Sequence, residues 1–291
     1  MTTEKARVRV GPAGWSYDDW KGIVYPPEMP RQLHPLEFLS RYFDTIEVNS
    51  SYYRPLQSTY VKKWIKLLDG NPRFKLTAKL YKTFTHDRDK WPSQQEVDAV
   101  RAGFDPLMDA GRLGAVLVQF PWSFKRTVEN RKWLARVLGT FSEYPLALEV
   151  RHASWNRPEV FEELAQRQIA FCNIDQPLFS NSLEPSDKVT ARVGYVRLHG
   201  RNANDWFREA AGRDERYDYL YSKEELGQWL RKIERIREMA TEVYAITNNH
   251  YRGQAVVNAF ELQDGLGIQK KNPLPESLVE AYPRLKELAS S

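Results

Sequence analysis

The chain has 291 residues, 42% of them apolar and 28% charged, which is the composition of a globular protein and excludes a disordered or fibrous one. Lys and Arg outnumber Asp and Glu by 43 to 38, and this formal charge of +5 is spread along the chain, without a basic arm. A single cysteine, Cys172, excludes an internal disulfide and a cysteine-rich metal module. No stretch is apolar enough for a signal peptide or a membrane span, so we expect a cytoplasmic protein with no membrane partner.

Short apolar runs alternate with longer segments of helical periodicity along the whole chain. The runs predict eight strands, at 7–11, 45–50, 74–80, 114–120, 146–151, 169–175, 194–200 and 242–249. Most intervals between them have apolar residues at helical spacing, but residues 176–193 contain two prolines and little such periodicity. We therefore expect an irregular sixth connection, and a closing helix on the outside formed by residues 272–291.

Eight strand–helix units in about 270 residues indicate an α/β protein built as a (β/α)8 barrel, that is, a TIM barrel. A doubly wound open sheet uses the same alternation. However, no G-x-G-x-x-G motif opens the first helix, and Pro12 and Trp15 stand where backbone would have to approach a phosphate. No linker or repeat divides the chain, so we predict one domain over residues 1–291.

Alternation along the predicted strands separates outward apolar side chains from inward polar ones. In the strand at 169–175, for example, Cys172 and Ile174 are predicted to face outward, and Asn173 and Asp175 inward. The same rule sends a larger polar set into the barrel: Arg9, Glu47, Asn49, Thr77, Lys79, Gln119, Glu149, Arg151, Tyr195, Arg197 and His199. Buried charges must be paired or must hold a ligand. Because most of these residues end their strands, where the active sites of TIM barrels lie, we interpret them as a site, with a structural ion network as the alternative.

Histidines and aromatic residues gather after the predicted strands. Four of the five histidines follow a strand, namely His86, His152, His199 and His250. Imidazole exchanges protons near neutral pH, and aromatic loop residues can stack on sugars or bases, although each one alone can also serve loop packing.

Seven motifs occur in order over nearly the whole chain: GWSYDDWKGIVYP (14–26), FDTIEVNSSYYR (43–54), FKLTAKLYKTFTH (74–86), VLVQFPWSFK (116–125), LALEVRHASW (146–155), YVRLHGR (195–201) and NNHYRGQAVVNAFEL (248–262). Together they resemble the YecE-like family, also described as domain of unknown function 72. The resemblance implies a TIM barrel, but no activity, cofactor or substrate. The chain departs from commoner members in GPAGW, where many have GTSGW, and in a long insertion at 202–218.

The preferred hypothesis is an enzyme that acts on a small anionic or sugar-bearing substrate, such as a sugar phosphate or nucleotide, at the C-terminal rim of the barrel. It would use acid/base chemistry without a metal or cofactor. The catalytic candidates are two carboxylates and an imidazole: Glu47, Glu149 and His199. The binding candidates offer cations, amides and aromatic faces: Trp15, Asn49, Tyr52, Lys79, Gln119, Arg151, Arg197 and Asn249.

Two other classes of function stay open. A divalent-metal-dependent enzyme of isomerase or endonuclease type would use Glu47, Glu149, Asp175 and His199 as ligands, although the neighbouring cations would compete for the carboxylates. A non-catalytic nucleic-acid-binding module would use the basic excess and the aromatic rim. We prefer a small-molecule partner because a deep barrel mouth suits a compact ligand better than a long strand.

Overall fold

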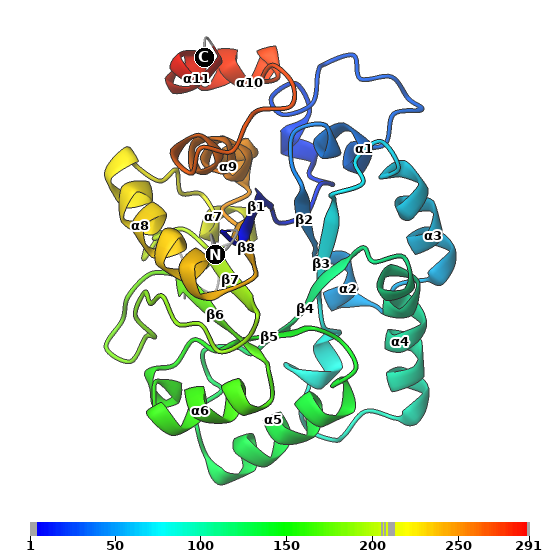
Figure 1. Ribbon diagram of the computed structural model, residues 1–291, viewed down its shortest axis with the longest axis vertical. Helices are drawn as coiled ribbons and strands as arrows, with labels where there is room; N and C mark the ends of the chain where they lie inside the picture. The colour runs from blue at the N-terminus through cyan, green and yellow to red at the C-terminus, as the bar shows by residue number, and fades with distance from the viewer. Residues whose placement is uncertain (1–4, 205, 207, 209–212, 290–291) are drawn as a thin grey trace.

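The computed structural model describes residues 5–204, 206, 208 and 213–289. Of the insertion expected at 202–218, residues 205, 207 and 209–212 therefore lie outside the described part. The strands form one parallel sheet in the order β1-β8-β7-β6-β5-β4-β3-β2, which curls into a barrel inside a ring of helices (Figure 1). The predicted TIM barrel is thus confirmed. Within the described residues, no helix combines the length and the apolar character needed to cross a bilayer.

The strands begin and end within two residues of the predicted bounds. They are β1 (Arg7–Pro12), β2 (Thr45–Val48), β3 (Lys75–Lys79), β4 (Leu113–Gln119), β5 (Leu146–Glu149), β6 (Ala170–Asp175), β7 (Val193–Leu198) and β8 (Glu242–Thr247). The helices are α1 (Pro35–Ser40), α2 (Ser50–Tyr53), α3 (Ser58–Leu67), α4 (Gln94–Asp109), α5 (Val128–Thr140), α6 (Pro158–Gln166), α7 (Arg213–Arg216), α8 (Lys223–Met239), α9 (Gln254–Gly265), α10 (Glu276–Ala281) and α11 (Lys286–Ala289). The short helix α2 was not predicted, and it ends β2 earlier than expected.

The core lies between the outward faces of the strands and the inner faces of the helices. Helix α4 shows the pattern, because Val97, Val100, Phe104 and Leu107 recur at helical spacing and are all buried. The buried apolar residues join into one cluster that extends over all eight strands. The helices therefore pack as a ring on the barrel, and the barrel interior is left to other side chains.

β1 and β2 close the barrel by a near approach instead of a ladder. Ala13, just beyond β1, forms an isolated bridge with Glu47, and the N–H of Gly14 donates to the carbonyl oxygen of Glu47 at 2.8 Å. A Cβ atom on Gly11 would lie 1.9 Å from the carbonyl oxygen of Thr45. Only glycine therefore allows the two strands to come this close.

The two irregular features expected from the sequence are confirmed. No helix forms in residues 176–192, between β6 and β7. The closing segment lies outside α9, where Arg284 pairs with Glu261 at 2.7 Å (Figure 1). It consists of two short helices, α10 and α11, because Pro283 interrupts it.

The two faces of β6 are the reverse of the prediction. Cys172 points inward, with its Sγ 4.0 Å from Oε2 of Glu149. Asn173 points outward, and its Oδ1 accepts a hydrogen bond from the N–H of Lys188 in the connection to β7. Asp175 pairs with an arginine that follows β7, and so it also leaves the interior. The rule of apolar side chains outward fails here because Phe171 packs outward on Phe161 of α6, and Asn173 on the same face binds backbone groups of the loop to β7.

Candidate functional site

The inward polar side chains form a connected network in the middle of the barrel. Arg197 of β7 lies at its centre: one terminal nitrogen donates to Glu47 Oε1 at 2.7 Å and the other to Glu149 Oε2 at 2.5 Å. The hydroxyl of Tyr195 donates to Glu47 Oε2 at 3.0 Å. These four residues are at most 1% exposed. The two carboxylates thus share one buried guanidinium, and Glu149 has a second cationic partner in Arg151.

His199 joins this network as a neutral imidazole. Its Nδ1 lies 3.0 Å from the side-chain nitrogen of Asn248, which donates to it, so Nε2 carries the proton and faces Glu149 Oε1 at 3.1 Å. Burial lowers the pKa of His199 to about 3, although the charge of Glu149 acts in the opposite direction. Burial alone would raise the pKa of Glu149, but the positive charges of Arg197 and Arg151 hold it well below its usual range. At neutral pH the pair is therefore imidazole and carboxylate.

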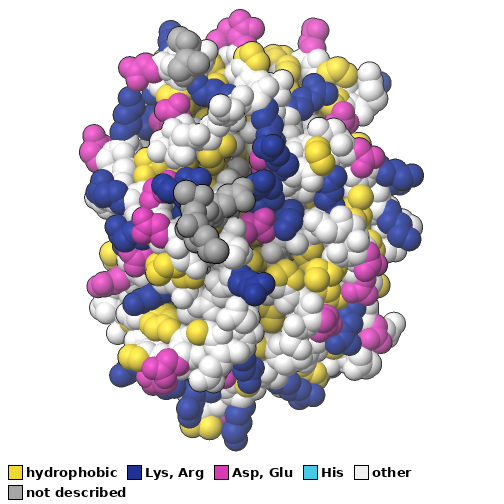
Figure 2. All heavy atoms as spheres, in the orientation of Figure 1, with side chains coloured by type: hydrophobic (Ala, Val, Ile, Leu, Met, Phe, Trp, Pro, Cys, Tyr) yellow, Lys and Arg dark blue, Asp and Glu magenta, His cyan; other side chains and the backbone are white. Residues whose placement is uncertain are grey.

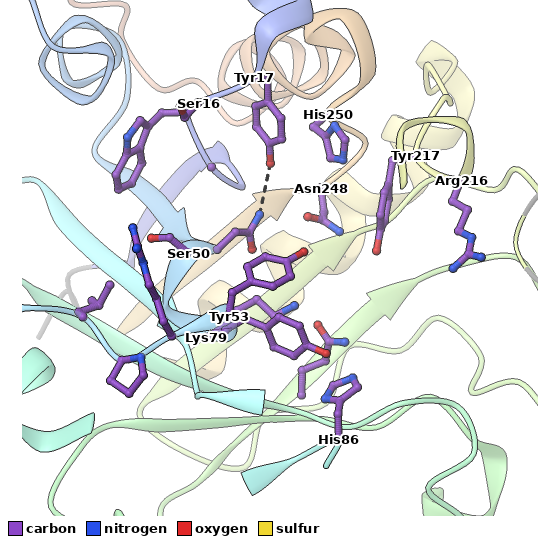
Figure 3. A pocket seen from close by; sticks show the side chains of 18 of the residues that line it. Ser16, Tyr17, Ser50, Tyr53, Lys79, His86, Arg216, Tyr217, Asn248 and His250 are labelled. Atoms are coloured by element: carbon purple, nitrogen blue, oxygen red, sulfur yellow. Dashed lines mark hydrogen bonds between the residues drawn. The ribbon is translucent and has the colours of Figure 1, made fainter. Parts of the chain in front are cut away.

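A cavity of about 890 Å³ opens above this network, at the C-terminal ends of the strands (Figure 3). Residues that end or follow every strand except β6 contribute to its described lining. Aromatic rings form much of the wall: Trp15, Tyr17, Tyr52, Tyr53, Tyr60, Trp64, Trp122, Trp206 and Tyr217. Trp15 packs edge-on against Trp64 with the ring centroids 5.2 Å apart, so these rings also brace one another.

Arg151 connects the cavity to the network beneath it. Its Nε donates to Glu149 Oε1 at 3.0 Å, and its guanidinium lies over the ring of Trp206, 5.4 Å from the centroid. Gln119 also lines the cavity, and its Oε1 accepts a hydrogen bond from Arg197 at 3.3 Å. The buried ion pairs thereby fix the orientation of groups that a ligand would meet.

Lys79 at the end of β3 contributes an amine to the same cavity. Its Nζ lies 4.4 Å from the ring centroid of Tyr52. Burial and the positive charge of Arg197 lower the pKa of Lys79 to about 7, against the opposing effect of Glu47. His86 packs edge-on against the same Tyr52 ring with the centroids 4.9 Å apart, and burial together with Lys79 lowers its pKa to about 4. At neutral pH this wall holds a partly unprotonated amine beside a neutral imidazole.

The described lining is basic in composition. Four cationic residues line the cavity, Arg54, Lys79, Arg151 and Arg216, and none of the described lining residues is Asp or Glu. Below the cavity, Glu47 and Glu149 bind Arg197, and Glu149 also pairs with Arg151. A basic lining of this kind suits an anionic ligand.

The residues predicted from the sequence divide into three groups. Six line the cavity: Trp15, Asn49, Tyr52, Lys79, Gln119 and Arg151. Four lie in the buried network beneath it: Glu47, Glu149, Arg197 and His199. Asn249 belongs to neither, because its side-chain nitrogen donates to the carbonyl of Tyr219 and to Asn258 behind the barrel wall. The expectation that Asn249 lines the cavity is wrong, and its neighbour Asn248 does so.

Loops also bring to the cavity residues that the predicted site did not include, although His250 was expected to follow a strand. Tyr17 stacks on His250 with the ring centroids 4.4 Å apart and accepts a hydrogen bond from Asn49 at 3.3 Å (Figure 3). Tyr217 lies on another side of His250, 5.1 Å away. Arg216 comes from the insertion after β7. The motif GWSYDDW contains Tyr17, but nothing in the sequence alone shows which loop residues turn inward.

The carboxylates proposed as metal ligands do not assemble into a metal site. In the parts of the chain that the structure describes, no three His, Cys, Asp or Glu side chains come together in a way that could hold a metal ion. Arg197 forms ion pairs with both Glu47 and Glu149. Asp175 pairs instead with Arg201, which follows β7. Three of the four expected ligands thus share one network, but a guanidinium lies between the two glutamates where the metal would have to be.

A family model described as "Protein of unknown function DUF72" matches residues 9–282. The chain belongs to the DUF72 family. This DUF72 chain is 28% identical over 284 residues to the UPF0759 protein YunF of Bacillus subtilis (strain 168), an alignment that covers 93% of the chain and 99% of the relative. The family inferred from the seven motifs is thereby confirmed.

Solved structures of the DUF72 family have the same fold. One from Thermotoga maritima is 34% identical with a TM-score of 0.78, and the match covers 90% of this chain and 99% of that one. Another from Enterococcus faecalis is 25% identical with a TM-score of 0.79, and the match covers 91% and 98% of the two chains. These relatives share the barrel, and their descriptions state no activity.

Proposed function

We propose that this DUF72 protein binds and acts on a compact anion that carries a ring, such as a sugar phosphate or a nucleotide, in the cavity at the C-terminal ends of its strands. The observation that carries this proposal is the described lining itself, which has four cationic side chains, no acidic one, and aromatic walls. Guanidinium and ammonium groups are the usual partners of phosphate and carboxylate, and aromatic faces suit a sugar or a base.

The size and the rigidity of the cavity support a small ligand. Its volume of about 890 Å³ lies within the range of pockets that enclose small molecules. Arg151 is held by Glu149 on one side and by Trp206 on the other, so its guanidinium is oriented before a ligand arrives. Such preorganisation reduces the entropic cost of binding.

In this proposal Glu47, Glu149 and His199 are positioning residues, in place of the proton-transfer groups expected from the sequence. All three have no exposed surface and are hydrogen-bonded within the network. A general acid or base must reach the proton that it transfers. The cavity wall has titratable groups of its own with lowered pKa values, among them Lys79 and His86.

The two alternative functions receive less support. The metal-dependent enzyme lacks a cluster of ligands in the described residues. For a nucleic-acid-binding module, a continuous basic surface would be expected, but on the face drawn in Figure 2 basic and acidic side chains are mixed. A cavity of about 890 Å³ suits a single nucleotide better than a strand.

Thermal shift measurements with paired ligands test the proposal. We expect ribose 5-phosphate or adenosine monophosphate to stabilise the protein, and ribose or adenosine at the same concentration to have little effect. At a ligand concentration 100 times Kd, the stabilisation should be about 2.7 kcal/mol. Arg151→Gln should remove most of this effect because it removes the fixed guanidinium.

Arg131→Gln is the matched control, because Arg131 is exposed on α5, away from the cavity, and should leave the shift unchanged. Equal stabilisation by neutral and phosphorylated compounds would refute the anion proposal. Binding of single-stranded oligonucleotides that weakens steeply with salt, without any effect of mononucleotides, would favour the nucleic-acid alternative.

A further inference from the structure

Lys79 differs from other lysines of the chain in its surroundings. It lines the cavity at the end of β3 and is neither fully buried nor exposed. In the described structure no carboxylate forms an ion pair with its amine, which lies instead over the face of Tyr52 at 4.4 Å. By contrast Lys82, three residues further along, pairs with Asp87 at 3.0 Å.

The charges around Lys79 favour its unprotonated form. Burial and the positive charges of Arg197 and Arg151 lower its pKa to about 7, so a large fraction of the amine is neutral under ordinary conditions. The hydrogen bond and charge of Asp87 raise the pKa of Lys82, which stays an ammonium ion. Only a neutral amine is a nucleophile, and proximity to other cations is a known way to obtain one.

We propose that Lys79 is a nucleophile that condenses with the aldehyde or ketone carbonyl of a phosphorylated ligand to form an imine. This inference rests on the proposed function and narrows its substrate class to anions that carry a carbonyl group. The arginines of the cavity bind the phosphate, and the ligand carbonyl reaches the amine of Lys79 on the cavity wall.

The condensation requires no oxidant or reductant. The nitrogen lone pair of Lys79 forms a bond to the carbonyl carbon, and the electrons of the C=O double bond move to the oxygen, which takes up a proton. The resulting carbinolamine loses that oxygen as water, and the nitrogen becomes doubly bonded to carbon. Both hydrogens of the original amine leave in the water molecule, and hydrolysis reverses every step.

His86 is placed to move these protons. It contacts the same Tyr52 ring as Lys79, with ring centroids 4.9 Å apart, and it lines the same cavity (Figure 3). Its Nδ1 interacts with the hydroxyl of Thr85 at 2.9 Å, which leaves Nε2 for exchange with the ligand. Its low pKa keeps it neutral near pH 7, where it accepts a proton and returns it.

Reductive trapping tests the imine. The full chain is incubated at pH 7 with pyridoxal 5′-phosphate, which carries a ring, an aldehyde and a phosphate, and is then treated with sodium borohydride to reduce the C=N bond. Peptide mass spectrometry should find the label on Lys79, at least tenfold above the other lysines. Its extent should rise with pH through a midpoint near 7, as the amine loses its proton.

Variants and analogues make the result specific. Lys79→Met and Lys79→Arg should lose the label, and Lys82→Met should retain it. Pyridoxal, which lacks the phosphate, should label Lys79 about tenfold less. An equal label on surface lysines, or an unchanged label at another site in Lys79→Met, would overturn the proposal.

Pyridoxine 5′-phosphate, which has the phosphate but no aldehyde, separates the two proposals. If it stabilises the protein in a thermal melt while pyridoxal 5′-phosphate leaves Lys79 unlabelled, the imine proposal fails and the anion site stands. If Lys79 is labelled equally by both aldehydes and neither phosphate compound stabilises the protein, the nucleophile stands and the anion site fails.

Discussion

Arg151 and Lys79 line the same cavity, yet their charges are held in different ways. Arg151 donates to Glu149, so its positive charge has a fixed partner at 3.0 Å. Lys79 has an aromatic ring beside its amine and two arginines close enough to disfavour its charge. One residue is thus a permanent cation, whereas the other titrates near neutral pH. This difference assigns anion binding to the first and chemistry to the second in the proposed function.

The titration of Lys79 predicts a dependence of stability on pH. Its pKa is about 7 in the folded chain, against the ordinary lysine value of 10.5 that applies to the unfolded chain, so between these values the unfolded chain binds more protons. Wild-type stability therefore gains from this group as the pH rises from about 7 to about 10. Lys79→Met removes the cost of the buried charge and should raise the free energy of unfolding at pH 7 by on the order of 3 kcal/mol.

Urea denaturation at pH 7 and pH 10 measures this effect. The difference between Lys79→Met and wild type should shrink toward zero at the higher pH, whereas Lys82→Met should differ from wild type by a small amount at both. If Lys79→Met exceeds wild type in free energy of unfolding by the same amount at pH 7 and pH 10, the surroundings of Lys79 do not lower its pKa.

The strands illustrate how far side-chain alternation predicts a site. On β5 and β7 the outward residues pack against helices and must be apolar, so the inward positions of Glu149, Tyr195, Arg197 and His199 followed from the sequence. On β6 the outward face combines Phe171, which packs on α6, with Asn173, which binds backbone of the loop to β7, so the rule gave the reverse. Alternation is thus informative only where every outward position packs against apolar side chains.

Glu149 of β5 pairs with Arg197 of β7 and so links two strands of the barrel. Glu149→Ala removes the partner of Arg197, Arg151 and His199 at once, and leaves a buried guanidinium with one carboxylate fewer. We expect a loss of about 3–5 kcal/mol in the free energy of unfolding, measured by chemical denaturation.

Glu143→Ala is the control, since Glu143 forms a surface pair with Arg101 and should cost about 1 kcal/mol or less. If Glu149→Ala is as stable as the control, or more so, the network is not a structural support. The catalytic role that the sequence suggested for this carboxylate would then become the better interpretation.

For the molecule as a whole, the order of strands was predictable because each unit repeats the same pattern of strand and helix. How deep each polar side chain lies in the barrel, relative to the cavity, could not be predicted. Glu47, Glu149 and Lys79 all end or nearly end a strand, yet the first two lie beneath the cavity and the third lines it. Depth depends on the stagger between neighbouring strands, and on loops such as the one that brings Tyr217 over the mouth. Neither is encoded in local periodicity.

Closure of the barrel between β1 and β2 depends on Gly11, which lies against Thr45 of β2. Gly11→Ala would put a methyl group 1.9 Å from the carbonyl oxygen of Thr45, and a backbone atom cannot swing away as a side chain can. The two strands must separate, which disturbs the isolated bridge at Ala13 and the adjoining wall of the cavity. We expect a loss of at least 2 kcal/mol in the free energy of unfolding, at the upper end of effects for a single methyl group.

Gly139→Ala is the matched control for this substitution. Gly139 lies in α5 with no atom within 4 Å of the added methyl group, so alanine should stabilise the helix by about 0.5–1 kcal/mol. The two variants therefore make the same chemical change but should shift the free energy of unfolding in opposite directions. Chemical denaturation compares them directly.

Gly11→Ala should also weaken the stabilisation by ribose 5-phosphate, because the chain that follows β1 carries Trp15 and Tyr17 into the cavity wall. If Gly11→Ala is as stable as wild type and keeps the full ligand shift, the close approach of β1 and β2 is not needed to close the barrel or to shape its mouth.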